Sequence, residues 1–207
     1  MRERCLSLQH NNTIHIIMQK IMFNDKFCLT KAVLDGTKTM TRRILKEGTP
    51  LGAWKETKKH LPYKVGDVLA IAQSYNDIFD ELEQKYGKAQ ANEWWCNALD
   101  SVGGGLDTSA GYKNKMFVRA DFMIHHIKFI NVRLERLQDI SDEECLREGI
   151  KQVNFIHYAF ENSSLLYLYP REAFAELIDK VCGKGTWESN PLVAAYSLEL
   201  VYLKRVL

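Results

Sequence analysis

The sequence lacks the cysteine and histidine patterns that build disulfide frameworks and zinc sites. Its five cysteines are odd in number, lie far apart and never form a C-x-x-C pair, which argues against a disulfide-stapled fold and a zinc ribbon. The six histidines include no H-E-x-x-H motif, and the adjacent His125 and His126 would point to opposite faces of a strand. We therefore expect a reducing, cytoplasmic location, no metal site and no cofactor.

Long apolar runs and low-complexity segments are also missing. No run of about 18 apolar residues is present to cross a membrane, and no continuous apolar region of a signal peptide follows Arg2 and Arg4. Apolar residues make up 46% and charged residues 26% of the 207 residues, a balance that argues against a disordered or collagen-like chain. The sequence predicts one globular domain with an insertion and no membrane partner.

Three parts of the chain differ in character. Residues 1–17 carry no clear periodicity, and Met18 is a candidate native start, which makes 1–17 an N-terminal extension and 18–207 the domain. Residues 75–112 are acidic and helix-favouring, and we interpret them as the insertion. Trp94 and Trp95 are expected to form its own core, with base stacking as the alternative. The glycines at 103–105 are expected in a surface loop, because they lack the Lys-Ser/Thr of a phosphate-binding loop.

Charge of one sign is not in excess, but opposite charges lie in separate blocks. The chain has 28 Lys and Arg against 26 Asp and Glu. Residues 38–64 hold eight basic and two acidic residues, and residues 65–111 reverse these numbers. The basic block is a candidate phosphate-facing surface, with solvated lysines as the alternative. Because neighbours on a strand face opposite sides, either Arg42 or Arg43 must point inward, where it needs a carboxylate or an anionic ligand.

Short strands with few helices between them predict an α+β fold with a small closed or nearly closed sheet. A one-residue bulge is expected between Phe129 and Val132, where the apolar alternation changes phase. The expected strands are 21–23, 38–44, 68–72, 117–118, 124–137 and 196–202. The expected helices, each framed by a cap or a stop signal, are 24–36, 141–149 and 170–183.

Five segments carry a resemblance to a known family. They are GTKTMTRR (36–43), YKVGD (63–67), VRLERLQDIS (132–141), EECLREG (143–149) and GKGTWESNP (183–191). In this order they resemble the ASCH domain family, relatives of the PUA RNA-binding fold, and in particular its phage- and gut-bacterium-associated branch. The match spans about Ile21 to Lys204, and only the insertion and residues 1–17 lack a counterpart.

The resemblance implies a PUA-like β-barrel with flanking helices and a cleft beside the barrel. Family members are thought to bind RNA or nucleotides, and a small bacterial branch hydrolyses the amide of N4-acetylcytidine with a Lys, a Thr and a Glu. By position these are Lys38, Thr41 and Glu148. That branch is shorter and lacks both the insertion and the GKGTW segment.

The chemistry of such a set makes geometric demands. A threonine hydroxyl needs a base to become a nucleophile, and a lysine is a base only if burial or neighbours lower its pKa. Lys38 and Thr41 would face opposite sides of an ideal strand, so Lys38 is expected to precede the regular strand. The ends of Lys38 and Glu148 should lie within hydrogen-bond reach or be bridged by one water.

We therefore expect binding of RNA or a modified nucleoside or nucleotide in a cleft formed by Lys38, Thr41, Glu148 and Arg42 or Arg43. The alternative activity is an amidohydrolase acting on an N-acylated cytidine. A third interpretation makes Thr41 an ordinary strand residue, Lys38 a surface cation and Glu148 a helix-end carboxylate.

Three further residues are weaker candidates for ligand binding. Arg119 is expected either to hold a phosphate or to form a structural ion pair. Trp187 and Asn190 are expected either to stack on and hydrogen-bond a base or to form a packed turn before the last strand.

Overall fold

The computed structural model of the protein describes residues 18–102 and 108–202. Its centre is a five-stranded mixed sheet in which β1 and β3 are parallel and the remaining neighbours are antiparallel. In spatial order the strands are β1 (Lys20–Ile21), β3 (Val68–Ile71), β4 (His126–Arg136), β7 (Leu192–Val201) and β2 (Met40–Ile44). A separate two-stranded sheet pairs β5 (Lys151–Gln152) with β6 (Tyr158–Ala159). The expected α+β class is therefore confirmed.

The expected closed barrel is not found. The strand order makes β1 and β2 the two edges of the sheet, and within the described residues no pairing joins them. The sheet is thus open on the side where the segment after β1 comes close to β2. The predicted extension 1–17 and the glycines at 103–105 lie outside the described residues.

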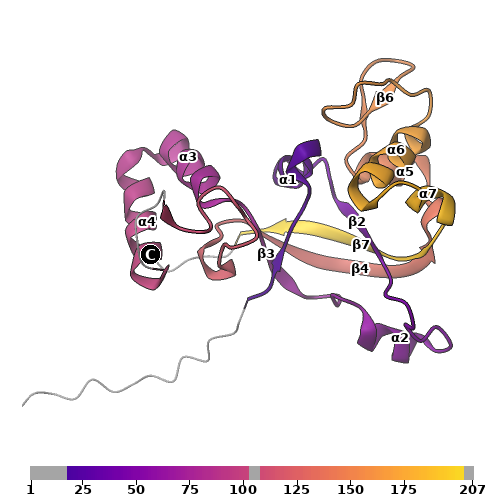
Figure 1. The fold of residues 1–207 in the computed structure, drawn as a ribbon, viewed down its shortest axis with the longest axis horizontal. Coiled ribbons are helices and arrows are strands. Elements are labelled where there is room, and N and C mark those ends of the chain that lie inside the picture. The colour runs from indigo at the N-terminus through magenta and orange to yellow at the C-terminus, as the bar shows by residue number, and fades with distance from the viewer. Residues whose placement is uncertain (1–17, 103–107, 203–207) are drawn as a thin grey trace, which may run out of the picture.

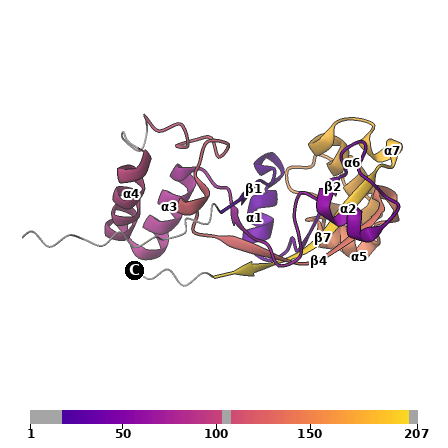
Figure 2. The same ribbon diagram turned by 90° about the horizontal axis from the view of Figure 1, so that it is seen from below.

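The helices gather at the two ends of the long strands β4 and β7 (Figures 1 and 2). One end carries α3 (Tyr75–Tyr86) and α4 (Lys88–Val102), which lie in the segment 75–112 that the sequence analysis interprets as an insertion. The other end carries α5 (Asp142–Arg147), α6 (Pro170–Cys182) and α7 (Thr186–Ser189). Helix α1 (Leu29–Leu34) lies between the two groups, and α2 (Trp54–His60), which connects β2 to β3, lies near the end that carries α5, α6 and α7. Short 3-10 helices are η1 (Asp25–Phe27), η3 (Ala120–Phe122) and η4 (Leu137–Asp139).

Several local predictions are confirmed. The pairing of β4 with β7 shifts register between Phe129 and Asn131, which is the expected bulge. Ser141 and Glu144 form the expected capping box of α5. Gly36 follows α1 with a φ of 78°, a left-handed conformation that glycine adopts without strain.

Three local predictions need correction, and one helix was not predicted. The helix expected over 24–36 is interrupted at Cys28, whose φ of 50° separates η1 from α1. Residues 117–118 are not a strand: the Val118 side chain packs inward and its carbonyl accepts a hydrogen bond from Lys20 Nζ at 2.7 Å. The last strand begins at Leu192, before the expected start at residue 196. Its first residues show no apolar alternation in the sequence because β7 lies between two strands and is buried on both faces. Helix α2 has no apolar period that could predict it, since only Thr57 is buried.

The apolar residues form two cores. The main core joins the sheet to α1, α5 and α6, with Phe129, Tyr196 and Phe174 at its centre. The second core packs α3 and α4 against the end of β3 and contains Trp94 and Trp95. The two tryptophans are therefore core residues, as expected, but they share this core with β3 and with Val118 and Met123, which lie outside 75–112.

Candidate functional site

The turn between α1 and β2 places Lys38 against the C-terminal end of α5. The Lys38 amide donates to Ala32 O at 2.7 Å, and the next amide, of Thr39, donates to Arg147 O at 2.9 Å. Strand β2 begins two residues after Lys38, so Lys38 precedes the regular strand, as expected from the sequence. Its Nζ donates to Glu148 Oε2 at 2.5 Å and to Glu148 O at 2.8 Å. The predicted approach of Lys38 and Glu148 is confirmed.

Glu148 is the C-cap residue of α5, and the helix face that carries it is set by Cys145, which is fully buried. Gly149 follows with a φ of 107°, a conformation that turns the chain away from the helix and that L side chains rarely adopt. A Cβ at Gly149 would also lie 3.1 Å from Leu29. These features leave the Lys38–Glu148 ion pair with exposed fractions of only 3% and 4%.

Arg42 is the inward-pointing arginine of β2, and carboxylates surround it. Its Nη1 donates to Glu148 Oε1 at 3.0 Å, and its Nη2 lies 2.6 Å from both Glu135 Oε1 and Glu144 Oε2. Arg133 donates to the same two glutamates, Glu135 and Glu144. With Lys38, three cations therefore face three carboxylates. An inward arginine was expected to need either a carboxylate or an anionic ligand, and Arg42 is paired with carboxylates.

The register of the sheet explains why these charges meet. Strands β2 and β4 flank β7, and Arg42 of β2 and Arg133 of β4 both pair with Ala195 of β7. Residues paired directly across neighbouring strands point to the same face of the sheet, so the two arginine side chains share one face. Ala195 is small and buried, which leaves space for two guanidinium groups. Glu135 follows Arg133 at the two-residue period of β4 and lies on that face as well.

Burial and neighbouring charges act in opposite directions at this cluster. Burial lowers the pKa of Lys38, and the Glu148 carboxylate opposes this shift without cancelling it. Burial also disfavours the charged form of Arg42, but the carboxylates of Glu148 and Glu135 outweigh it and raise the pKa of Arg42. Lys38 is therefore the cation of this cluster that is easiest to deprotonate.

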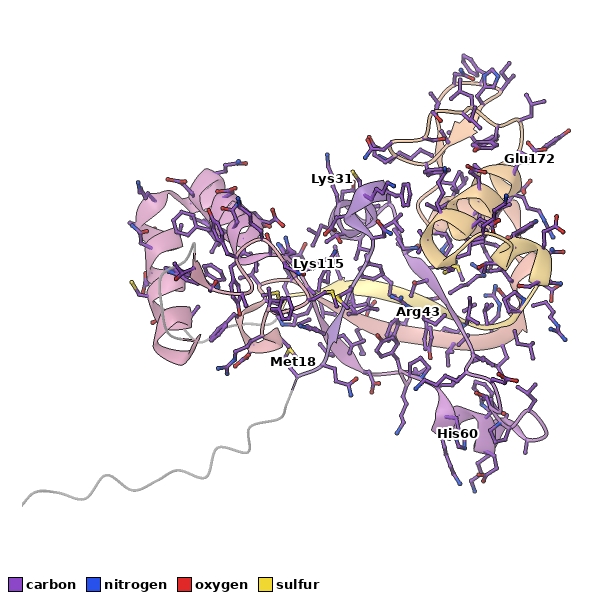
Figure 3. All side chains as sticks on the ribbon, viewed as in Figure 1. Met18, Lys31, Arg43, His60, Lys115 and Glu172 are labelled. Carbon is purple, nitrogen blue, oxygen red and sulfur yellow. The ribbon has the colours of Figure 1, made fainter. Side chains whose placement is uncertain are left out.

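A cavity of about 740 Å³ opens beside β2, within the size range of ligand pockets. Its polar lining includes Lys38, Thr41, Arg42, Arg43 and Glu148, the residues expected to form the cleft. Helix α6 supplies an apolar wall through Phe174, Leu177, Ile178 and Val181. The segment 22–24 and the residues 60–62 at the end of α2 line the remaining sides. Figure 3 shows Arg43 on β2 and His60 on α2 below it.

Two polar groups at this cavity have unused hydrogen-bonding capacity. The hydroxyl of Thr41 has no hydrogen-bond partner within the described residues, although the residue is only 5% exposed. Arg43 donates from Nη2 to Met22 O at 3.2 Å and lies 5.9 Å from the Phe23 ring, but its buried Nε has no partner in the described part of the chain. Thr41 lines the cavity, so its hydroxyl can pair with a ligand there, whereas Arg43 Nε is enclosed and would reach a ligand only after the side chain shifts.

Arg119, Trp187 and Asn190 are not brought to the cavity, since none of them lines it. Arg119 is an exposed side chain that pairs with Asp121 at 2.5 Å. Trp187 packs edge-on against Phe174, with ring centroids 6.2 Å apart. Asn190 accepts a hydrogen bond from the Gln138 amide at 2.8 Å. For these three residues, the geometry matches the structural alternative in each pair of expectations.

Sequence analysis did not identify Arg133, Glu135, Glu144 or the α6 wall as parts of this region. The two-residue spacing of Arg133 and Glu135 on a predicted strand was the available signal for a shared face. Glu144 was identified only as a capping residue. In the structure it caps α5, and its carboxylate also pairs with Arg42 at 2.6 Å. The α6 residues were predicted as an apolar stripe, without their position beside β2.

Within the residues that the structure describes, no helix is long and apolar enough to span a membrane, and no group of three or more His, Cys, Asp or Glu is placed to hold a metal ion. Comparisons of the chain with protein-family models, with curated proteins and with solved structures found no match.

Proposed function

We propose that the cavity beside β2 binds a modified nucleoside or nucleotide, free or as part of an RNA strand. The observation that carries this proposal is a cavity that has an apolar wall on α6 and the polar side chains of Thr41, Arg42 and Arg43 in its lining. A nucleobase has this character, with apolar faces and polar edges. The resemblance of the five sequence segments to the ASCH family supports the same ligand class.

The surroundings of the cavity also favour a ligand with phosphates. Lys46 and His60 line the cavity, and α2 carries the exposed Lys55, Lys58 and Lys59 beside it. Lysines at this position would neutralise phosphates of a nucleotide or an RNA strand. Such a ligand agrees with the cytoplasmic location expected from the cysteine pattern.

We also propose that the five-stranded sheet is an open form of the PUA-like barrel. Its two edges, β1 and β2, approach each other at the cavity, where Arg43 of β2 donates to Met22 O just after β1. A ligand seated there would contact both edges.

Arg43→Met is expected to weaken nucleotide binding about 10- to 100-fold, the 1.5–3 kcal/mol typical of a hydrogen bond to a charged group. Isothermal titration calorimetry with cytidine, N4-acetylcytidine, cytidine 5′-monophosphate and a short oligoribonucleotide measures this effect. Affinity for the last two probes should also fall as salt is raised.

Arg119→Met is the matched control, because it removes the same charge from an exposed arginine that does not line the cavity. Equal losses in both variants would contradict the assignment to this cavity. If none of the four probes binds, the proposed function itself is contradicted.

The second candidate function is hydrolysis of an N-acylated cytidine-type nucleoside. It is favoured by one specific observation: the Thr41 hydroxyl without a partner lines the same cavity as Lys38, whose pKa burial lowers. Neutral Lys38 would accept the Thr41 proton as the oxygen attacks the amide carbonyl. The C–N bond then breaks, the proton passes to the leaving amine, and water hydrolyses the acyl-threonine ester to release the acid.

Glu148 and Arg43 have supporting roles in this reaction. Glu148 orients Lys38 through the 2.5 Å contact between Nζ and Oε2 and can take part in proton transfer. Arg43 lines the cavity, and its guanidinium charge would stabilise negative charge on the carbonyl oxygen.

A further inference from the structure

The segment 151–169 presents an apolar outer surface. It contains β5 and β6, and its large apolar side chains that are more than half exposed are Val153, Phe155, Ile156, Leu165, Leu166, Leu168 and Tyr169. Phe155 is 99% exposed. The segment stands at the outer end of the molecule, above α6 in Figure 1.

The inner side of this segment is firmly attached to the main core. Phe160 is buried and packs edge-on against Phe27, with ring centroids 5.4 Å apart. Asn162 donates from Nδ2 to Lys26 O at 2.9 Å. The backbones of Tyr158 and Tyr167 exchange hydrogen bonds of 2.8 and 2.9 Å. The exposed side chains therefore belong to an anchored structure with a defined outer face.

We propose that this outer face is the interface of a homodimer formed with a second copy of the same chain. Its seven large side chains, each more than half exposed, together offer on the order of 700 Å² of accessible surface, close to the ~800 Å² per partner of a standard interface.

The charges of the segment favour a second copy over a charged partner. Lys151 and Glu161 are its only Lys, Arg, Asp or Glu residues, and they pair with each other at 2.7 Å. The face is therefore neutral, and an identical face meets no like charge when it packs across a twofold axis.

The proposed interface is independent of the candidate functional site. None of the described residues that line the cavity comes from 151–169. The cavity-facing residues of α6 begin at Phe174, after the segment has ended. A dimer formed in this way keeps both cavities accessible, and its test does not depend on the proposed function.

Sedimentation velocity of the full chain, from about 1 to about 100 μM, tests the proposal. The unaltered protein should sediment as a dimer at the upper concentrations. Phe155→Asp combined with Leu168→Asp should raise the dimer dissociation constant more than about 100-fold, because each interface would then bury four carboxylates. Phe155→Ser with Leu168→Ser, which adds no charge, should shift it in the same direction.

Phe117→Asp is the matched control, since Phe117 is 61% exposed and lies outside the segment. It should leave the dimer unchanged. A protein that is monomeric over the whole concentration range would overturn the proposal. A dimer that survives both double variants would overturn it as well, and would place the interface elsewhere.

Discussion

Arg42→Met is expected to lower the free energy of unfolding by about 3–5 kcal/mol, the range typical of a buried ion pair that loses one partner. Arg42 is the residue that contacts Glu135, Glu144 and Glu148 together, and methionine would leave their charges poorly compensated. Urea denaturation at neutral pH measures the loss. Lys59→Met is the control, because the Lys59–Glu56 pair is exposed and should contribute less than about 1 kcal/mol.

The effect of Arg42→Met should depend on pH in a defined direction. Burial raises the pKa of Glu144, but Arg133 and Arg42 outweigh it and hold that pKa below its ordinary value. Stability from such a group is present above the unfolded-state pKa of about 4.3 and is lost as pH falls through the folded pKa. The difference between variant and unaltered protein should therefore shrink on acidification. A loss under 1 kcal/mol, or one that is constant with pH, would contradict the role assigned to Arg42.

Lys38→Arg is expected to reduce hydrolysis of N4-acetylcytidine by about 100- to 10,000-fold, the range typical of losing a general base. Arginine keeps the positive charge opposite Glu148 but cannot deprotonate at accessible pH. The rate of cytidine formation, followed by chromatography, gives kcat and KM, and the loss should appear in kcat. Because burial lowers the pKa of Lys38, kcat/KM of the unaltered protein should rise with pH and level off below the ordinary lysine pKa of about 10.4.

Thr41 offers matched variants for the same reaction. Thr41→Ser keeps the hydroxyl and should retain activity, whereas Thr41→Val keeps the shape and should lose it. Equal activity of Thr41→Val and Thr41→Ser would contradict a nucleophilic Thr41. If the unaltered protein releases no cytidine, the second candidate function fails, while nucleotide binding in the cavity is still open to its own test.

The parts of the fold predicted from sequence are those with a local signal. The Ser141–Glu144 capping box and the phase change at the β4 bulge are determined by neighbours in the chain. The approach of Lys38 to Glu148 was expected from the order of the motifs and is present in the structure. Its catalytic role stays a prediction.

The parts that were missed depend on pairing between distant segments. Arg42 and Arg133 meet because both pair with Ala195, and no local pattern specifies that register. The apolar stripe of α6 was predicted, but its use as a cavity wall depends on the position of α6 beside β2. The closed barrel was expected from the resemblance, and the described strands leave the sheet open between β1 and β2.

Methyl NMR of the labelled protein, titrated with cytidine 5′-monophosphate and N4-acetylcytidine, tests the central claim that the cavity beside β2 is a nucleotide site. Leu177, Ile178 and Val181 line the cavity, whereas Ile78 and Val118 lie in the second core, which contains Trp94 and Trp95. Saturable shifts at the three cavity residues, with Ile78 and Val118 unchanged, are the predicted result. Saturable shifts confined to the insertion, or no saturable shift with either ligand, would contradict the account.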